Sequence, residues 1–101
     1  MLLHMDVRHH IGGNDFVWDA DKAATTWRVR GIRFEDAATV FQDPLLVLVD
    51  AARNDESRDA VIGFDRLARL LFVVHIEIDG DCIRIISVRP AELHEEALYA
   101  Q

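Results

Sequence analysis

The chain has 101 residues, 50% of them hydrophobic and 29% charged, which is the composition of one ordinary globular domain and excludes a disordered chain. Its single cysteine, Cys82, excludes an internal disulfide framework and a cysteine-rich zinc site. The net charge of −7 argues against nonspecific binding to duplex nucleic acid, although a few clustered arginines can still bind a phosphate. The apolar runs are too short to cross a bilayer, and no signal peptide is evident, so we expect a cytoplasmic protein without a membrane partner.

Residues 1–15 show no useful periodicity, and the histidine pair followed by Gly12-Gly13 is typical of a flexible N-terminal arm. A metal site built from His4, His9 and His10 is the functional alternative. The solvated arm is favoured, because no carboxylate or cysteine at metal-ligand spacing accompanies the histidines. We therefore expect one folded domain over residues 16–101 and no bound metal.

The first half of that domain predicts a short strand and two helices. The apolar patch at 16–18 is typical of a strand or its stub. Residues 20–30 predict a helix that Asp19 caps at its N-terminus and Gly31 ends. Residues 34–42 predict a second helix, because their apolar side chains recur at helical spacing and form one stripe.

The second half predicts strands and a closing helix. Apolar or β-branched runs of strand length occupy residues 45–49, 59–64, 70–78 and 83–88. Asp79-Gly80 indicates a two-residue hairpin turn between the last two runs, and residues 91–99 predict a final helix. The order predicts a compact α+β domain, with an antiparallel sheet of about four strands backed by the two N-terminal helices and followed by a C-terminal helix.

The predicted hairpin places three chemically useful side chains together. With a two-residue turn, His75 lies opposite Arg84, and Glu77 lies on the same sheet face. A carboxylate, an imidazole and a guanidinium can take up a proton, return it and hold phosphoryl charge. The alternatives are a solvated ion pair and a histidine packed in the core.

The two faces of this hairpin are both largely apolar. The helices are predicted to cover the face that carries Val74 and Ile85. The opposite face is then predicted to leave four aliphatic side chains for a partner or for the closing helix to cover: Leu71, Val73, Ile86 and Val88.

Several stretches between residues 16 and about 99 resemble, in order and at matching spacing, motifs of the BrnT family of bacterial toxins. FVWD at 16–19 with Lys22 resembles the family's F-x-W-D-x-x-K opening, and GIRFEDA at 31–37 resembles G-V-S-F-E-E-A. Further matches are FQDP at 41–44, the E-x-R that ends at Arg58, and IRIISVR at 83–89.

The resemblance implies a RelE-like fold and a ribonuclease that arrests translation by cleaving RNA without a metal or organic cofactor. It also implies a BrnA-like antitoxin as protein partner and RNA as substrate; a homo-oligomer is left open. Arg58, Arg84 and Arg89 match the family pattern and are expected to bind the phosphate. His75 or Glu77 is expected to be the acid or base, on the register argument above.

The alternative function is a catalytically weakened BrnT-like domain that acts only as a protein-binding module. The closing helix of the family is usually rich in arginine, whereas this one has three glutamates and no cation. The loss of positive charge would weaken contact with RNA.

Overall fold

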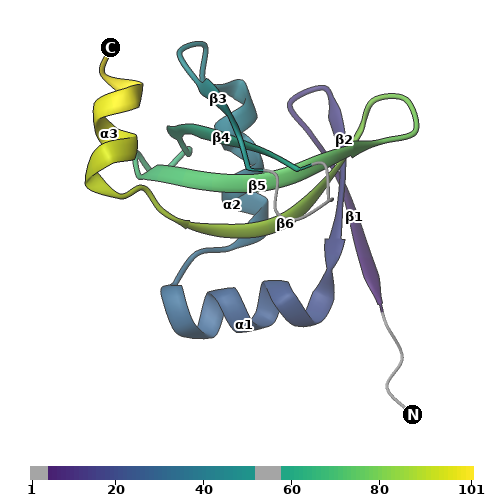
Figure 1. Ribbon diagram of the computed structural model, residues 1–101. Helices are drawn as coiled ribbons and strands as arrows, with labels where there is room; N and C mark the ends of the chain where they lie inside the picture. The colour runs from purple at the N-terminus through teal and green to yellow at the C-terminus, as the bar shows by residue number, and fades with distance from the viewer. Residues whose placement is uncertain (1–4, 52–57) are drawn as a thin grey trace.

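The computed structural model describes residues 5–51 and 58–101. Its elements, in chain order, are β1 (Asp6–Ile11), β2 (Asn14–Asp19), α1 (Ala20–Arg30), α2 (Phe34–Ala38), the 3-10 helix η1 (Thr39–Gln42), β3 (Val47–Asp50), β4 (Asp59–Phe64), β5 (Leu70–Ile78), β6 (Cys82–Pro90) and α3 (Leu93–Tyr99). The strands form one sheet in the order β1-β2-β6-β5-β4-β3 (Figure 1). The predicted α+β class is confirmed, with six strands instead of about four.

The sheet is mixed, so the expectation of a purely antiparallel sheet is wrong. β2 runs parallel to β6, whereas every other neighbouring pair is antiparallel. The chain between β2 and β6 contains α1, α2, η1 and the three strands β3, β4 and β5. The N-terminal hairpin thereby forms one edge of the sheet, with β2 beside the last strand β6.

The segment predicted to be a flexible arm, residues 1–15, contains β1 and the start of β2. Gly12 and Gly13 form the turn between these strands, and both adopt positive φ, which glycine tolerates at little cost. Val7 and Ile11 pack against the core, while the intervening side chains are exposed. A strand with so few apolar residues has a weak sequence signal, which explains why the prediction was wrong here.

The helices begin and end close to the predicted residues. The Asp19 side chain accepts a hydrogen bond from the Lys22 amide at the start of α1, and Gly31 ends the helix in the left-handed conformation. The second predicted helix is α2 followed directly by η1.

The β5–β6 hairpin has a three-residue turn instead of the predicted two-residue turn. Ile78 pairs with Cys82, so Asp79, Gly80 and Asp81 form the turn, and an irregularity follows at Val74/His75. A slip of one residue moves side chains to the opposite face of a sheet.

This slip separates two of the predicted site residues. His75 pairs with Ile85, whereas Arg84 pairs with Ile76. The predicted pairing of His75 with Arg84 is therefore wrong, and these two side chains lie on opposite faces of the sheet.

One face of the sheet, here called the core face, packs against α2, η1 and part of α1. Leu71, Val73 and Val88 are almost completely buried there, together with Ile85. They pack with α2 and η1 through Phe34, Ala37, Ala38 and Val40. The prediction that the helices cover the face of Val74 is wrong, as is the prediction of an exposed patch around Leu71 and Val73. Both faces of the hairpin are apolar, so the pattern could not choose between them.

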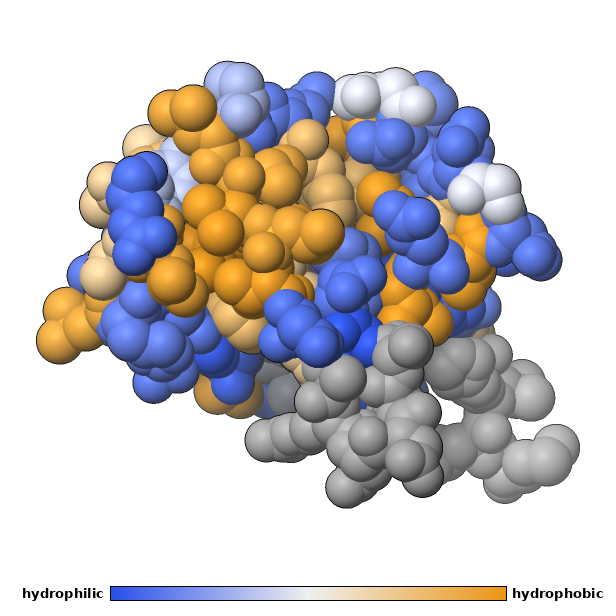
Figure 2. All heavy atoms as spheres, turned by 45° about the horizontal axis from the view of Figure 1, so that its top comes forward, coloured by the Kyte–Doolittle hydropathy of each residue, from blue (hydrophilic) through white to orange (hydrophobic). Residues whose placement is uncertain are grey.

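Among the described residues, α3 covers one end of the other face, here called the open face. There α3 places the Tyr99 ring edge-on against Phe64, with ring centroids 5.3 Å apart. Farther from α3, every second side chain of β3 and β5 points to this face and is half-buried. We call these aliphatic and aromatic residues the open-face patch: Val47, Val49, Phe72, Val74 and Ile76. Figure 2 looks onto this side of the molecule and shows a continuous hydrophobic area beside hydrophilic side chains.

Candidate functional site

His75 is a core residue. It is 3% exposed, its ring meets Phe41 edge-on at a centroid distance of 4.9 Å, and its Nδ1 lies 3.4 Å from the Val73 carbonyl oxygen. Burial lowers the pKa of His75 below its ordinary value of 6.5, against smaller opposing contributions from Val73 and nearby carboxylates. An imidazole enclosed in this way is not placed to meet RNA.

This burial predicts a pH-dependent stability. Because the pKa of His75 is lower in the folded chain than in the unfolded chain, the unfolded chain binds more protons as the pH falls below about 6.5. The free energy of unfolding should therefore fall between pH 7 and pH 5. His75→Leu should flatten this dependence in denaturant titrations at several pH values. Equal pH dependence in the wild type and His75→Leu would contradict the assignment.

Glu77 shares the core face with His75 but lies at the exposed turn end of β5. Arg84 and Arg89 lie on the open face. The structure thus does not bring together the carboxylate, imidazole and guanidinium that the two-residue turn predicted.

Arg84 lies on the open face near the start of β6. It pairs with Ile76 on one side and with Val17 on the other. Its guanidinium donates two hydrogen bonds to Asp6 of β1, at 2.9 and 3.3 Å, and these bonds raise the pKa of Arg84.

Arg89 lies at the opposite end of β6 and is held by α3. Its guanidinium donates to both carboxylate oxygens of Glu95 at 2.7 Å, lies 3.2 Å from Glu92, and stacks over the Phe72 ring at 4.2 Å. The hydrogen bonds from Arg89 lower the pKa of Glu95 despite its burial. In this geometry Arg89 fastens α3 to the sheet.

Arg58 directly precedes β4, and its carbonyl oxygen accepts a hydrogen bond from the Ala51 amide. Because Asp59 pairs with His75, Arg58 comes level with Ile76, which also pairs with Arg84. Arg58, directly before β4, and Arg84, on β6, therefore lie on either side of Ile76 in the central strand β5. The residues before Arg58 in the E-x-R motif, Glu56 and Ser57, lie outside the described residues.

Asp43, from the FQDP stretch, has a structural role. It accepts hydrogen bonds from the Tyr99 hydroxyl at 2.6 Å and from the Phe64 and Leu45 amides at 2.9 Å. Burial alone would raise the pKa of Asp43, but these hydrogen bonds together lower it. Asp43 thus joins the end of α3 to the end of β4 and to the turn before β3.

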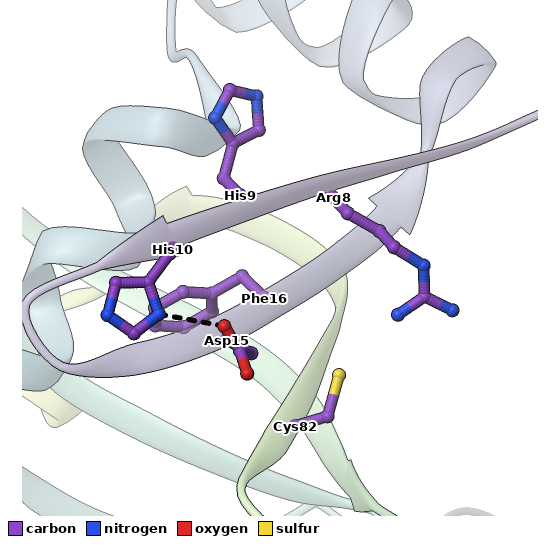
Figure 3. A pocket seen from close by; sticks show the side chains of 6 residues that line it. All are labelled: Arg8, His9, His10, Asp15, Phe16 and Cys82. Carbon is purple, nitrogen blue, oxygen red and sulfur yellow. Dashed lines mark hydrogen bonds and ion pairs between the residues drawn. The ribbon is translucent and has the colours of Figure 1, made fainter.

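The N-terminal hairpin contributes a pocket that sequence reasoning missed. It is lined by Arg8, His9, His10, Asp15, Phe16 and Cys82 (Figure 3). The His10 ring nitrogen Nδ1 lies 2.7 Å from Asp15 Oδ1. The Gly12-Gly13 pair, which is typical of a two-residue hairpin turn, was the available signal for this hairpin.

Two further observations concern metals and membranes. In residues 5–51 and 58–101, no group of three or more histidine, cysteine or acidic side chains is placed to hold a metal ion. His4, one of the three histidines considered for such a site, lies outside those ranges. Across the same ranges, none of the helices has the length and apolar character needed to cross a membrane.

Comparison with known protein families gives a match. No curated protein matches the chain significantly. A family model described as the ribonuclease toxin BrnT of type II toxin–antitoxin systems matches residues 18–95, which is more than half of the chain and includes all three arginines singled out by motif. The chain therefore belongs to the BrnT family of ribonuclease toxins of type II toxin–antitoxin systems.

Proposed function

We propose that this toxin is a metal-independent endoribonuclease that arrests translation in the cytoplasm, and that its helix-backed sheet is a RelE-like fold. The observation that carries the proposal is the position of Arg58 and Arg84, which lie within the family match and flank Ile76 on the open face. Two guanidinium groups on one open surface suit a phosphate, because each can donate paired hydrogen bonds to its oxygens.

The proposed reaction is attack by an RNA 2′-hydroxyl on the adjacent phosphorus. Arg84 would stabilise the charge that develops on the phosphate oxygens. The guanidinium would first have to leave Asp6. Both side chains of this pair are partly exposed, and such pairs contribute only about 0 to 1 kcal/mol, so exchanging the carboxylate for a phosphate costs little.

The test is expression without an antitoxin. The wild type should arrest growth, and Arg84→Ala should relieve the arrest and lower the cleavage rate about 100-fold, the typical cost of removing one group that stabilises transition-state charge. Arg28→Ala, on the exposed surface of α1, is the matched control and should remain as toxic as the wild type. Full toxicity of a folded Arg84→Ala variant would contradict the proposed site.

The second candidate is a protein-binding module without activity. It is favoured by the carboxylates that engage two expected phosphate-binding arginines: Asp6 engages Arg84, and Glu95 engages Arg89. A wild-type chain that binds its antitoxin but neither cleaves RNA nor slows growth would show that the protein acts as a binding module.

A type II toxin has a cognate antitoxin. We propose that a BrnA-like antitoxin covers the open-face patch, because contiguous exposed apolar surface on a small protein commonly marks an interface. This patch lies beside Arg84, so the antitoxin would also block the approach of RNA to the proposed site.

A further inference from the structure

We propose that the β1–β2 hairpin supplies the general base of the ribonuclease reaction: His10, oriented by Asp15, with Arg8 beside it as a phosphate-binding residue. This inference rests on the proposed ribonuclease function. It concerns a pocket in a hairpin that lies almost wholly before the residues matched by the family model.

The hydrogen bond between His10 and Asp15 selects the tautomer of the imidazole. The two residues are cross-strand partners, and Nδ1 lies 2.7 Å from the carboxylate oxygen. An ionised carboxylate only accepts hydrogen bonds, so Nδ1 carries the proton and the neutral ring presents its lone pair at Nε2. Both side chains are about two-thirds exposed, so a substrate can reach this nitrogen.

Arg8 lies two residues before His10 on the same side of β1. Figure 3 shows Arg8 and His10 on the side of the strand that faces Asp15 and Cys82, whereas His9 points to the other side. His9 instead stacks on Trp18, with ring centroids 5.0 Å apart. Within the part of the chain that the structure describes, Arg8 forms no ion pair, so its guanidinium is available to an anion.

The pocket continues the open face toward Arg84. Val17 pairs with Arg8 on one side and with Arg84 on the other, so the two arginines share one row across three strands. With strands about 4.8 Å apart, their backbones are separated by roughly 10 Å, which two long side chains can span around one phosphate. His10, Asp15 and Cys82 form the adjacent row.

The carboxylate nearest to Arg84 on this face is Asp6 of the same hairpin, and both of its oxygens already accept hydrogen bonds from that arginine. Among the described residues of β4, β5 and β6, the open face presents no imidazole and no carboxylate. His75 is buried on the core face, and Glu77 projects from that same face. The hairpin is therefore the part of the sheet that brings a proton acceptor to the side of Arg84.

The step balances with these groups and water. His10 Nε2 takes the proton of the 2′-hydroxyl while the 2′-oxygen forms a bond to phosphorus and the bond from phosphorus to the 5′-oxygen breaks. Water protonates the departing 5′-oxygen, and the hydroxide left behind takes the proton from the His10 imidazolium. The products are a 2′,3′-cyclic phosphate and a 5′-hydroxyl end.

The experiment uses the full chain in a cell-free translation reaction that contains end-labelled messenger RNA. We expect His10→Ala to cleave at least about 100-fold more slowly than the wild type, as loss of a general base requires, and added imidazole to restore part of the rate. Asp15→Asn should lower kcat with little change in KM, because it misorients the base without removing a phosphate contact. Arg8→Ala should mainly raise KM.

His94→Ala, at an exposed position on α3, is the matched control and should cleave like the wild type. If the wild type cleaves and His10→Ala cleaves equally fast, or if imidazole restores nothing to a slow variant, the role of His10 is overturned while the ribonuclease assignment stands. If the wild type cleaves no RNA in this reaction, the proposed function fails and this inference fails with it.

Discussion

Arg89→Met is expected to lower the free energy of unfolding by about 3 kcal/mol, the lower end of the cost of breaking a buried ion pair. The Glu95 side chain is 4% exposed and accepts two hydrogen bonds from Arg89, whose own side chain is 29% exposed, besides one from the Glu92 amide. Because methionine keeps much of the aliphatic contact with Phe72, the decrease in the free energy of unfolding measures mainly the cost of leaving the Glu95 carboxylate buried without its cation. Chemical denaturation of the two proteins at pH 7 measures the difference.

The double variant Arg89→Met with Glu95→Leu separates structure from catalysis. Replacing both charges by apolar groups of similar size should recover part of the lost stability, because no ion remains buried without a partner. The recovery is incomplete because Glu95→Leu also removes the hydrogen bond that Glu95 accepts from the Glu92 amide at the start of α3. If Arg89 serves only to hold α3 on the sheet, this folded variant should still cleave RNA. A folded double variant without activity would instead assign Arg89 the phosphate-binding role that the family resemblance implies.

The predicted features that the structure confirms are those with local causes. Asp19 and Gly31 mark the ends of α1, because a side-chain cap and a left-handed glycine act within a few residues. The strand runs and the closing helix were also predictable, since their apolar patterns match the period of each element. The α+β class followed from the order of these elements.

The predicted features that the structure contradicts depend on contacts distant in sequence. The hairpin register depends on whether Asp81 belongs to the turn or to the strand. Because Asp81 belongs to the turn, Arg84 lies on the opposite face of the sheet from His75. β1 carries too few apolar residues to be distinguished from a tail, yet it pairs along its whole length with β2. The pocket around His10 and Asp15 exists only because of that pairing.

Val73→Asp and Val74→Asp, although adjacent in β5, are expected to have different consequences. Val73 is fully buried on the core face between the sheet and α2. An unpaired carboxylate there adds the cost of burying a charge to the lost apolar contacts, roughly 4 kcal/mol or more, which approaches the whole stability of a small domain. Val73→Asp should therefore be recovered unfolded or insoluble, with no cooperative transition on heating.

Val74 belongs to the open-face patch, where a charge remains in contact with water. Val74→Asp should fold, with a free energy of unfolding lower by about 1 kcal/mol, which is the range of measured strand propensities. It should bind the cognate antitoxin at least about tenfold more weakly, because the substitution places a carboxylate in the apolar centre of the proposed contact. Val29→Asp, on the exposed surface of α1, is the matched control and should bind as the wild type does. Titration calorimetry with the purified antitoxin measures all three proteins. Unchanged affinity of a folded Val74→Asp would place the antitoxin on another surface, since a docked apolar segment could not accommodate that charge without loss.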